Sequence, residues 1–351
     1  MISVKYISLS LLRWLFGAVF VFSGLVKSVD PVGTSVFVEK YLATYGLGML
    51  MECALPIAIV LAVVELTIGV AVIVNAFRRT TLRVALLFVV LFTVITLLSA
   101  TLLPIGDCGC FGDAVTLSSW ATFWKNIALL VAVVVLAKYD DRESKTSNVQ
   151  IATALMGVLI ALGVNLYALR HQPLIDFLPY KVGTDLRTAI FNERAAAAEN
   201  MVLVFRDKGT GEEYLFAPTD SGCWLDEGLE YVDVRQKAMP DAEYADFAIY
   251  DAAGNDVSTE LLEQEGRVAW LCVASLDVVD AEYERGITNL TDHYPRHAIK
   301  VLASVENDGE MFCLECYTVD AMTLRSMMRS KIGVIVINNG VVELKADIRD
   351  I

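Results

Sequence analysis

The sequence predicts a multi-domain protein in which a bundle of membrane-spanning helices is followed by an α/β soluble part. The chain has 351 residues and a hydrophobic fraction of 56%. Its mean hydropathy of +0.54 is too high for an ordinary soluble protein. Charge is distributed unevenly: residues 1–170 carry 12 Lys and Arg against 9 Asp and Glu, whereas residues 171–351 carry 16 against 33. An apolar half therefore precedes an acidic half.

Five apolar stretches are long enough to cross a bilayer, which takes about 20 residues each. They cover residues 7–27, 51–76, 82–103, 120–138 and 150–169. The first stretch lacks a small-x-small cleavage site and leads into further spans, so it is interpreted as a retained helix. We expect a four-helix membrane domain over residues 1–145 and a fifth membrane helix within residues 146–172.

Basic residues in the short loops predict the orientation of these helices. They are Lys5 and Arg13, then Arg78, Arg79 and Arg83, then Lys138, Arg142 and Lys145. We expect them on the cytoplasmic face of an inner membrane, together with the N-terminus. Residues 28–50 and 104–119 are then outer loops, and everything after the fifth helix is periplasmic. The lipid bilayer is one expected partner, and the acidity of the second half excludes nucleic acid as another.

Three charged residues in or beside the spans are candidate cofactor-binding residues. Glu65 lies mid-span, where a carboxylate is costly and usually faces the bundle interior or a cavity. It is either a partner for a proton or a quinone headgroup, or a protonated hydrogen-bonding group between helices. Lys27, at the outer end of the first span, is either functional or extended toward lipid headgroups. Lys125 lies about one turn into the fourth span and could face the loop before it. Quinone is the candidate cofactor.

That loop contains Asp107-Cys108-Gly109-Cys110-Phe111-Gly112-Asp113, a pair of cysteines one residue apart. A disulfide at this spacing closes a small strained ring, and strained, exposed disulfides are more oxidising than structural ones. Gly109 permits the backbone angles that such a ring needs. The two acids disfavour a thiolate, so an activating charge would come from Lys125 or Lys27. The alternatives are a structural tie and a metal site, although two ligands without a nearby histidine suit zinc poorly.

The first 140 residues share a set of motifs with a known family of membrane proteins: Phe22-Ser23-Gly24, Lys27, Asp30-Pro31, Glu65, Gly69, the segment 107–113, Trp120 and Phe123-Trp124-Lys125-Asn126. On these residues the segment resembles the DoxX-like superfamily and, within it, the MauE (methylamine utilisation) type. The resemblance implies a four-helix membrane bundle associated with redox maturation, methylamine metabolism and disulfide formation in a dehydrogenase subunit. DoxX relatives imply quinone-coupled sulfur oxidation, and the whole chain looks like the longer DoxX-type proteins of Bacteroidetes.

The soluble half is expected to contain a small, mostly β connecting module over residues 173–245 and a second domain over residues 246–351. In the second domain, strand, helix and strand are followed by a helix and a hairpin with an Asn-Gly turn. This order resembles a thioredoxin-like domain. The expected elements are a strand over 267–274, a helix over 281–294, a strand over 298–305, a helix over 319–329, and hairpin strands over 332–337 and 341–344.

The cysteines of this half depart from the thioredoxin pattern. Cys272 stands alone where a CxxC is expected, and Ile332 stands near the place of the usual cis-proline. A CxxC occurs later, at Cys313 and Cys316, a spacing typical of dithiol redox motifs and of half a zinc site. The alternatives are a structural disulfide and a pairing of Cys272 with one of the two. Cys223 is interpreted as an unpaired structural cysteine.

The favoured hypothesis is a membrane thiol–disulfide oxidoreductase that acts on periplasmic protein clients. Its candidate catalytic residues are Cys108, Cys110, Cys313 and Cys316. One alternative is a non-enzymatic assembly or binding factor with a degenerate thioredoxin-like domain. Another is a DoxX-type quinone oxidoreductase subunit in which the cysteines are incidental. The sequence does not determine the oligomeric state.

Overall fold

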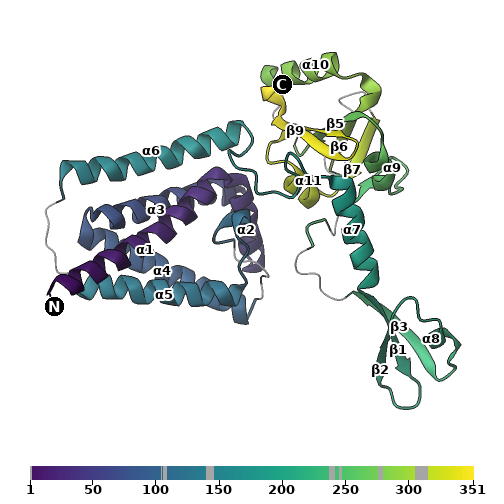
Figure 1. Cartoon of the computed structure of the whole chain (residues 1–351), viewed down its shortest axis with the longest axis horizontal. Helices are drawn as coiled ribbons and strands as arrows, with labels where there is room; N and C mark the ends of the chain where they lie inside the picture. The colour runs from purple at the N-terminus through teal and green to yellow at the C-terminus, as the bar shows by residue number, and fades with distance from the viewer. Residues whose placement is uncertain are drawn as a thin grey trace. The chain divides into compact units, whose positions relative to one another are not determined.

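The computed structural model describes residues 2–103, 105, 109–139, 146–236, 242–244, 247–275, 280–304 and 315–351, with side chains from residue 6 onward. The chain divides into two compact units, Met1–Phe177 and Leu178–Ile351 (Figure 1). The first unit is helical, and the second combines helices with two β-sheets.

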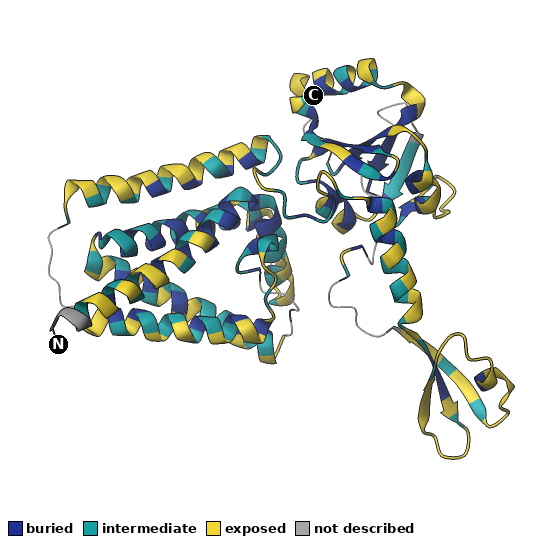
Figure 2. Ribbon diagram, viewed as in Figure 1, coloured by how far each residue is buried: buried dark blue, intermediate teal, exposed yellow. Residues whose placement is uncertain are grey.

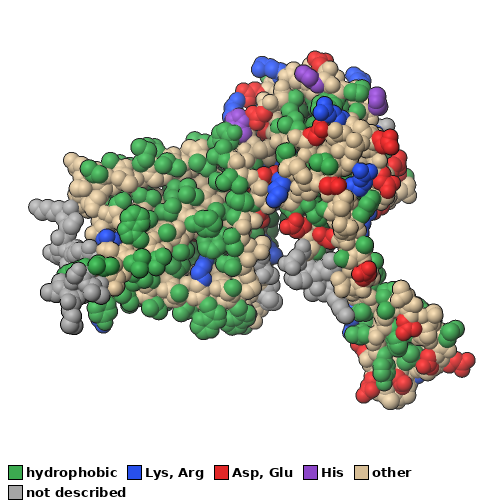
Figure 3. Space-filling view, viewed as in Figure 1, with side chains coloured by type: hydrophobic (Ala, Val, Ile, Leu, Met, Phe, Trp, Pro, Cys, Tyr) green, Lys and Arg blue, Asp and Glu red, His purple; other side chains and the backbone are tan. Residues whose placement is uncertain are grey.

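The first unit contains the five predicted spans. Each is a helix that is long and apolar enough to cross a membrane: Tyr6–Val29 in α1 (Ile2–Val29), Gly48–Val74 over η1 (Gly48–Cys53) and α3 (Ala54–Val74), α4 (Arg78–Thr101), α5 (Ser119–Tyr139) and α6 (Asn148–Arg170). Apolar side chains cover much of the visible surface of this unit (Figure 3), and its helices carry many exposed positions (Figure 2). Leu11, Leu87 and Leu159 are among the exposed apolar residues. The protein is therefore a multi-pass membrane protein.

The expected outer loop over residues 28–50 is largely helical, which corrects the sequence interpretation. It holds α2 (Pro31–Thr44), which begins directly after α1. Asp30 caps α2, because its side chain accepts a hydrogen bond of 2.7 Å from the Gly33 N–H. Pro31 supplies a first helical residue that needs no N–H partner and cannot continue α1. The two residues together separate two helices where hydropathy indicated a loop.

Helices α1 and α3 pack closely at three glycines. A Cβ atom on Gly24 would lie 2.5 Å from the backbone nitrogen of Leu66, and one on Gly69 would lie 2.6 Å from that of Val21. A Cβ atom on Gly17 would lie 2.4 Å from Ile73. Small residues at membrane-helix interfaces let backbones approach in this way. The side chains next to these glycines, including that of Glu65, are thereby brought against α1.

The second unit is built around a six-stranded sheet of order β4-β7-β6-β5-β8-β9. Strands β5, β6 and β7 are parallel to one another, whereas β8 and β9 continue the sheet in antiparallel fashion. Helix α10 (Ala281–His293) connects β5 to β6, and α11 (Ala321–Met327) connects β7 to β8. The strands are β4 (Ile249–Tyr250), β5 (Arg267–Val273), β6 (Ile299–Ala303), β7 (Glu315–Val319), β8 (Ile332–Asn338) and β9 (Val341–Asp347).

Apolar clusters cover both faces of this sheet. One contains Trp270 and Cys272, and the other contains Leu271 and Val273, as the alternation of side chains along β5 requires. The first cluster also includes Leu186 of α7 (Leu186–Glu199), so this part of the expected connecting module packs with the six-stranded sheet. Strand β7 was not predicted, because a five-residue run gives little periodicity.

A second, smaller sheet follows α7 in the chain. Strands β1 (Met201–Asp207), β2 (Glu213–Phe216) and β3 (Leu229–Gln236) form an antiparallel sheet of order β2-β1-β3. Its small core consists of Leu203, Phe205 and Cys223. The thiol of Cys223 is buried and donates to the carbonyl oxygen of Asp220 at 3.0 Å, in keeping with a structural cysteine.

Candidate functional site

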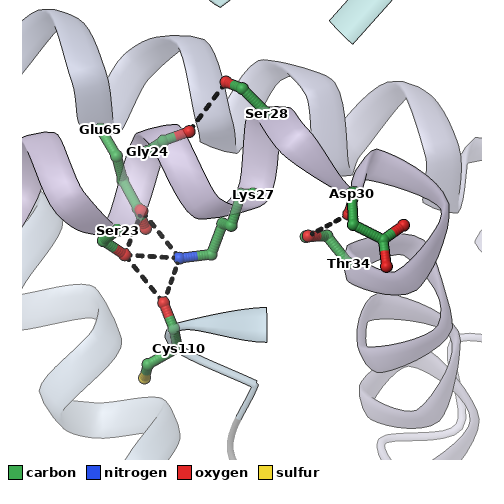
Figure 4. Close-up of polar contacts among 8 residues, drawn as sticks. All are labelled: Ser23, Gly24, Lys27, Ser28, Asp30, Thr34, Glu65 and Cys110. Carbon is green, nitrogen blue, oxygen red and sulfur yellow. Dashed lines mark hydrogen bonds and ion pairs between the residues drawn. The ribbon is translucent and has the colours of Figure 1, made fainter. Parts of the chain in front are cut away.

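Three polar side chains from α1 and α3 meet inside the helical unit (Figure 4). The Lys27 ammonium lies 2.7 Å from the Glu65 carboxylate and donates to the Ser23 hydroxyl at 2.7 Å. Ser23 also lies 2.6 Å from Glu65. All three residues are buried, with 4% of Lys27 and 5% of Glu65 exposed. Lys27 therefore turns inward to an ion pair, and the interpretation that it extends toward lipid headgroups is wrong.

The local sequence explains this geometry. Ser23 and Lys27 are four residues apart on α1 and so share one face of the helix. Gly24 lies between them in sequence and meets Leu66, the neighbour of Glu65, at the close crossing with α3. A buried carboxylate needs a partner that offsets its lost hydration, and Lys27 supplies one. Glu65 of α3 is thereby joined to α1 through its contacts with Lys27 and Ser23.

The ion pair also binds the cysteine loop through its backbone. Lys27 and Ser23 both contact the carbonyl oxygen of Cys110, Ser23 at 2.8 Å. The Lys27 ammonium thus has acceptors for all three of its N–H donors: Ser23, Glu65 and the Cys110 carbonyl. Figure 4 shows the Cys110 sulfur pointing away from Lys27, which therefore holds the backbone of the loop rather than the thiol. Cys108 lies outside the described residues.

Gly109, between the two cysteines, seats the loop on α2. Its φ of +63° is in the left-handed region that glycine adopts easily. A Cβ atom at this position would lie 2.4 Å from the Phe37 ring. Both the backbone angle and the available space therefore require glycine here. The loop is held from two sides, by the ion pair and by the aromatic ring of α2.

A cavity of about 490 Å³ adjoins this site within the helical unit. Its walls are largely apolar and come from α1 to α5 and from the cysteine loop. The three predicted cofactor-binding residues, Lys27, Glu65 and Lys125, all line it, as does Cys110. The Lys125 ammonium lies 4.5 Å from the centre of the Phe111 ring. The fold thus brings together residues that the sequence places up to about 100 positions apart.

Sequence reasoning missed several contributors to this site. Ser23 is one of them, and its four-residue spacing from Lys27 is the signal in the sequence that places both side chains on one helix face. Phe37, Tyr41 and Tyr45 also line the cavity, but they were placed in a loop. The apolar and aromatic residues of this segment do not recur with a clear helical period, so the sequence did not predict a helix there.

In the second unit, Cys272 and Cys316 are not positioned to form a disulfide with each other. Cys272 is opposite Leu302 on β6, whereas Cys316 is opposite Val301 from the other side of that strand. Their side chains thus face opposite sides of the sheet, and β5 and β7 are about 10 Å apart. A disulfide needs Cα atoms within about 7 Å. Cys313 lies outside the described residues.

The thiol of Cys272 is also expected to be unreactive. It is 1% exposed, and burial raises the pKa of its thiol to about 12 because the thiolate would lose its hydration. The thiolate is the reactive form of cysteine. Cys272 therefore has a thiol that is inaccessible and protonated at neutral pH.

Comparison with known protein families gives a match to part of the chain. Residues 5–139 match the family model described as methylamine utilisation protein MauE. The match begins near the start of α1 and ends with α5, so it covers the cavity and the cysteine loop but neither α6 nor the second unit. No curated protein and no solved structure matches the chain.

Proposed function

We propose that this membrane protein carries out thiol–disulfide exchange through Cys108 and Cys110, on periplasmic protein clients. The observation that carries the proposal is that Lys27 and Ser23 both hydrogen-bond to the carbonyl oxygen of Cys110. Two buried side chains and a tightly fitted glycine hold the backbone of a Cys-Gly-Cys segment, while the Cys110 sulfur points away from them. Rigid support of this kind suits a reactive pair whose sulfurs must be presented to another molecule.

The exchange balances without a metal. A client thiolate attacks the Cys108–Cys110 disulfide, the S–S bond breaks and a mixed disulfide forms. A second client thiolate then attacks this mixed disulfide, which leaves the client oxidised and the pair as two thiols. Return to the disulfide requires loss of two electrons and two protons. A quinone, reduced to the hydroquinone, is the acceptor class that we propose.

The context is carried by the family match. The matching family is named for methylamine utilisation, and this name supports methylamine metabolism as the process served. The likeness to DoxX proteins supports the quinone link. An outward-facing cysteine loop follows from Arg78, Arg79 and Arg83 in the first turns of α4, because such residues favour the cytoplasmic face of an inner membrane.

The second unit is proposed to be a thioredoxin-like domain that binds clients rather than oxidising them through Cys272. The strand order β6-β5-β8-β9, with β5 parallel to β6 and β8 antiparallel to both neighbours, supports the likeness. Helices α10 and α11 occupy the two connections that this topology needs. The buried Cys272 supports a degenerate active site, which is the feature that favours a non-enzymatic assembly factor as the second candidate function.

Thiol trapping of the purified full chain tests the proposal. Wild-type protein, Cys108→Ser and Cys110→Ser are incubated with a reduced dithiol peptide, quenched with N-ethylmaleimide and mapped by mass spectrometry. We expect wild type to oxidise the peptide and each single variant to lose this activity. Cys223→Ser, which removes a buried thiol elsewhere, is the matched control and should behave as wild type. Unchanged peptide oxidation by both loop variants would favour the assembly-factor function.

A further inference from the structure

Among the described residues, the charged side chains that line the cavity in the helical unit are Lys27, Glu65 and Lys125. Lys27 and Glu65 pair with each other, so Lys125 is the described lining cation that no described lining carboxylate balances. Among the described residues, Lys125 has a ring contact with Phe111 but no hydrogen-bonding or ion-pair partner. An ammonium group held in a membrane span without such a partner is costly. The cavity is therefore electrostatically matched to a ligand that brings acceptor oxygens.

The donors available to a ligand lie on α5 rather than on α1. The three N–H donors of Lys27 are already used by Ser23, Glu65 and the Cys110 carbonyl. Asn126, next to Lys125, is 4% exposed and gives one amide hydrogen to Thr96 at 3.3 Å. Asn126 has a second amide hydrogen to donate, and both Asn126 and Lys125 line the cavity. These two residues form the polar end of the site.

The rest of the cavity suits an apolar tail that enters from the membrane. Aromatic and aliphatic side chains of α2 and α4 dominate the walls. Leu91 of α4 lines the cavity and is also 56% exposed on the outward surface of an apolar span. The cavity therefore reaches the side of the helical unit at a level where lipid would surround it. A volume of about 490 Å³ is that of a small-molecule site.

We propose that the cavity binds one membrane-soluble amphiphile, whose head bears acceptor oxygens and contacts Lys125 and Asn126, and whose tail passes Leu91 toward the bilayer. This inference rests on the proposed function, since the ligand would lie beside the cysteine loop. In this arrangement Lys27 and Glu65 hold the cysteine loop, and Lys125 binds the oxygen-bearing end of the ligand. Quinones and fatty acids share this chemistry.

Native mass spectrometry of the purified full chain tests the site with decylubiquinone and with oleic acid. We expect one molecule of at least one probe to bind, and Lys125→Gln to weaken its binding at least about tenfold through loss of a charge-assisted hydrogen bond. Lys125→Arg should retain binding. Lys138→Gln, on the same helix but outside the cavity lining, is the control and should bind as wild type.

A second pair of variants tests the tail path independently of the charge. Leu91→Trp should block binding, whereas Leu87→Trp should not, because Leu87 is 71% exposed but does not line the cavity. Selective binding of decylubiquinone would identify a quinone site. Selective binding of oleate would identify a site for the carboxylate of a fatty acid. Binding of neither probe, or binding unaffected by both Lys125→Gln and Leu91→Trp, would overturn the proposal.

The same titration on the Cys108→Ser and Cys110→Ser variants separates this inference from the proposed function. Retained binding with unchanged peptide oxidation would leave the amphiphile site standing and reject the exchange function. The opposite result is that wild type binds neither probe but still oxidises the peptide, and that the Cys108→Ser and Cys110→Ser variants do not oxidise it. This result would reject the amphiphile site and leave the exchange function standing.

Discussion

Lys27 and Glu65, 38 residues apart in sequence, form a buried ion pair at 2.7 Å between α1 and α3. The same ammonium contacts the carbonyl oxygen of Cys110. This relationship couples the packing of two membrane helices to the position of the cysteine loop. A change in any of the three partners should therefore affect both stability and the chemistry of the loop.

Removing one member of the ion pair should be more harmful than removing both. Lys27→Met leaves a buried carboxylate without its cation, and such losses cost about 3–5 kcal/mol. The double variant Lys27→Met/Glu65→Leu replaces both charges with apolar groups of similar size and should recover most of the thermal stability. Unfolding in detergent, followed by circular dichroism, provides the measurement. Lys138→Met, at an exposed lysine, is the control.

If the double variant is no more stable than Lys27→Met, the buried charge is not what destabilises the single variant. The double variant should still show altered thiol chemistry, because the Cys110 carbonyl has lost the Lys27 donor.

The close contact between α1 and α3 predicts that alanine is more harmful at Gly24 than at a glycine with open space around it. Gly24→Ala places a methyl group against the backbone nitrogen of Leu66, 2.5 Å away, so the helices must separate. We expect a loss of about 1–3 kcal/mol, typical of overpacking. Gly163→Ala is the matched control, because nothing lies within 4 Å of a Cβ atom there. Equal melting temperatures for the two variants would contradict the close packing.

Gly109→Ala should disturb the cysteine loop for two reasons that can be separated. Its left-handed backbone disfavours alanine by about 1–2 kcal/mol, and its Cβ atom would overlap the Phe37 ring. Gly46 has a similar φ of +71° but open space around it, so Gly46→Ala reports the backbone cost alone. We expect Gly109→Ala to change the alkylation rate of Cys110, whereas Gly46→Ala leaves that rate unchanged.

Adding Phe37→Ala to Gly109→Ala should partly restore the Cys110 alkylation rate by removing the overlap. No restoration would show that the ring does not seat the loop.

Cys272 should be unreactive in the folded protein. It is 1% exposed, and its thiol remains protonated at neutral pH. Iodoacetamide at pH 8 should therefore leave Cys272 unmodified in the native chain and modify it after guanidinium denaturation, as measured by peptide mapping. Native modification at the rate seen in the denatured chain would restore Cys272 as a candidate for exchange chemistry.

The same thiol should make stability depend on pH in the alkaline range. Burial raises the pKa of Cys272 to about 12 from a reference of 9.0, so the unfolded chain loses this proton before the folded chain does. Its contribution to the free energy of unfolding is therefore complete below pH 9.0 and falls as the pH rises toward about 12. Cys272→Val should flatten that part of a plot of unfolding temperature against pH. An identical slope in wild type and variant would contradict the assignment.

The sequence by itself determined the membrane spans and the identity of the charged residues within them. A run of about 20 apolar residues has few alternatives to a spanning helix, and a carboxylate or lysine in such a run stands out against it. It also determined most elements around the six-stranded sheet, because buried strands and an Asn-Gly turn are local signals. It did not reveal α2 or β7, whose short segments lack a strong period.

Only the tertiary structure decided how these residues combine. Glu65, Lys27 and Cys110 come together because glycines permit a close crossing of α1 and α3, and no local pattern encodes the distance between two helices. The direction in which Lys27 points, the glycine fit against Phe37 and the cavity beside Lys125 likewise depend on side chains remote in the sequence. The opposite faces of Cys272 and Cys316 depend on strand register, which the sequence of either strand alone does not set.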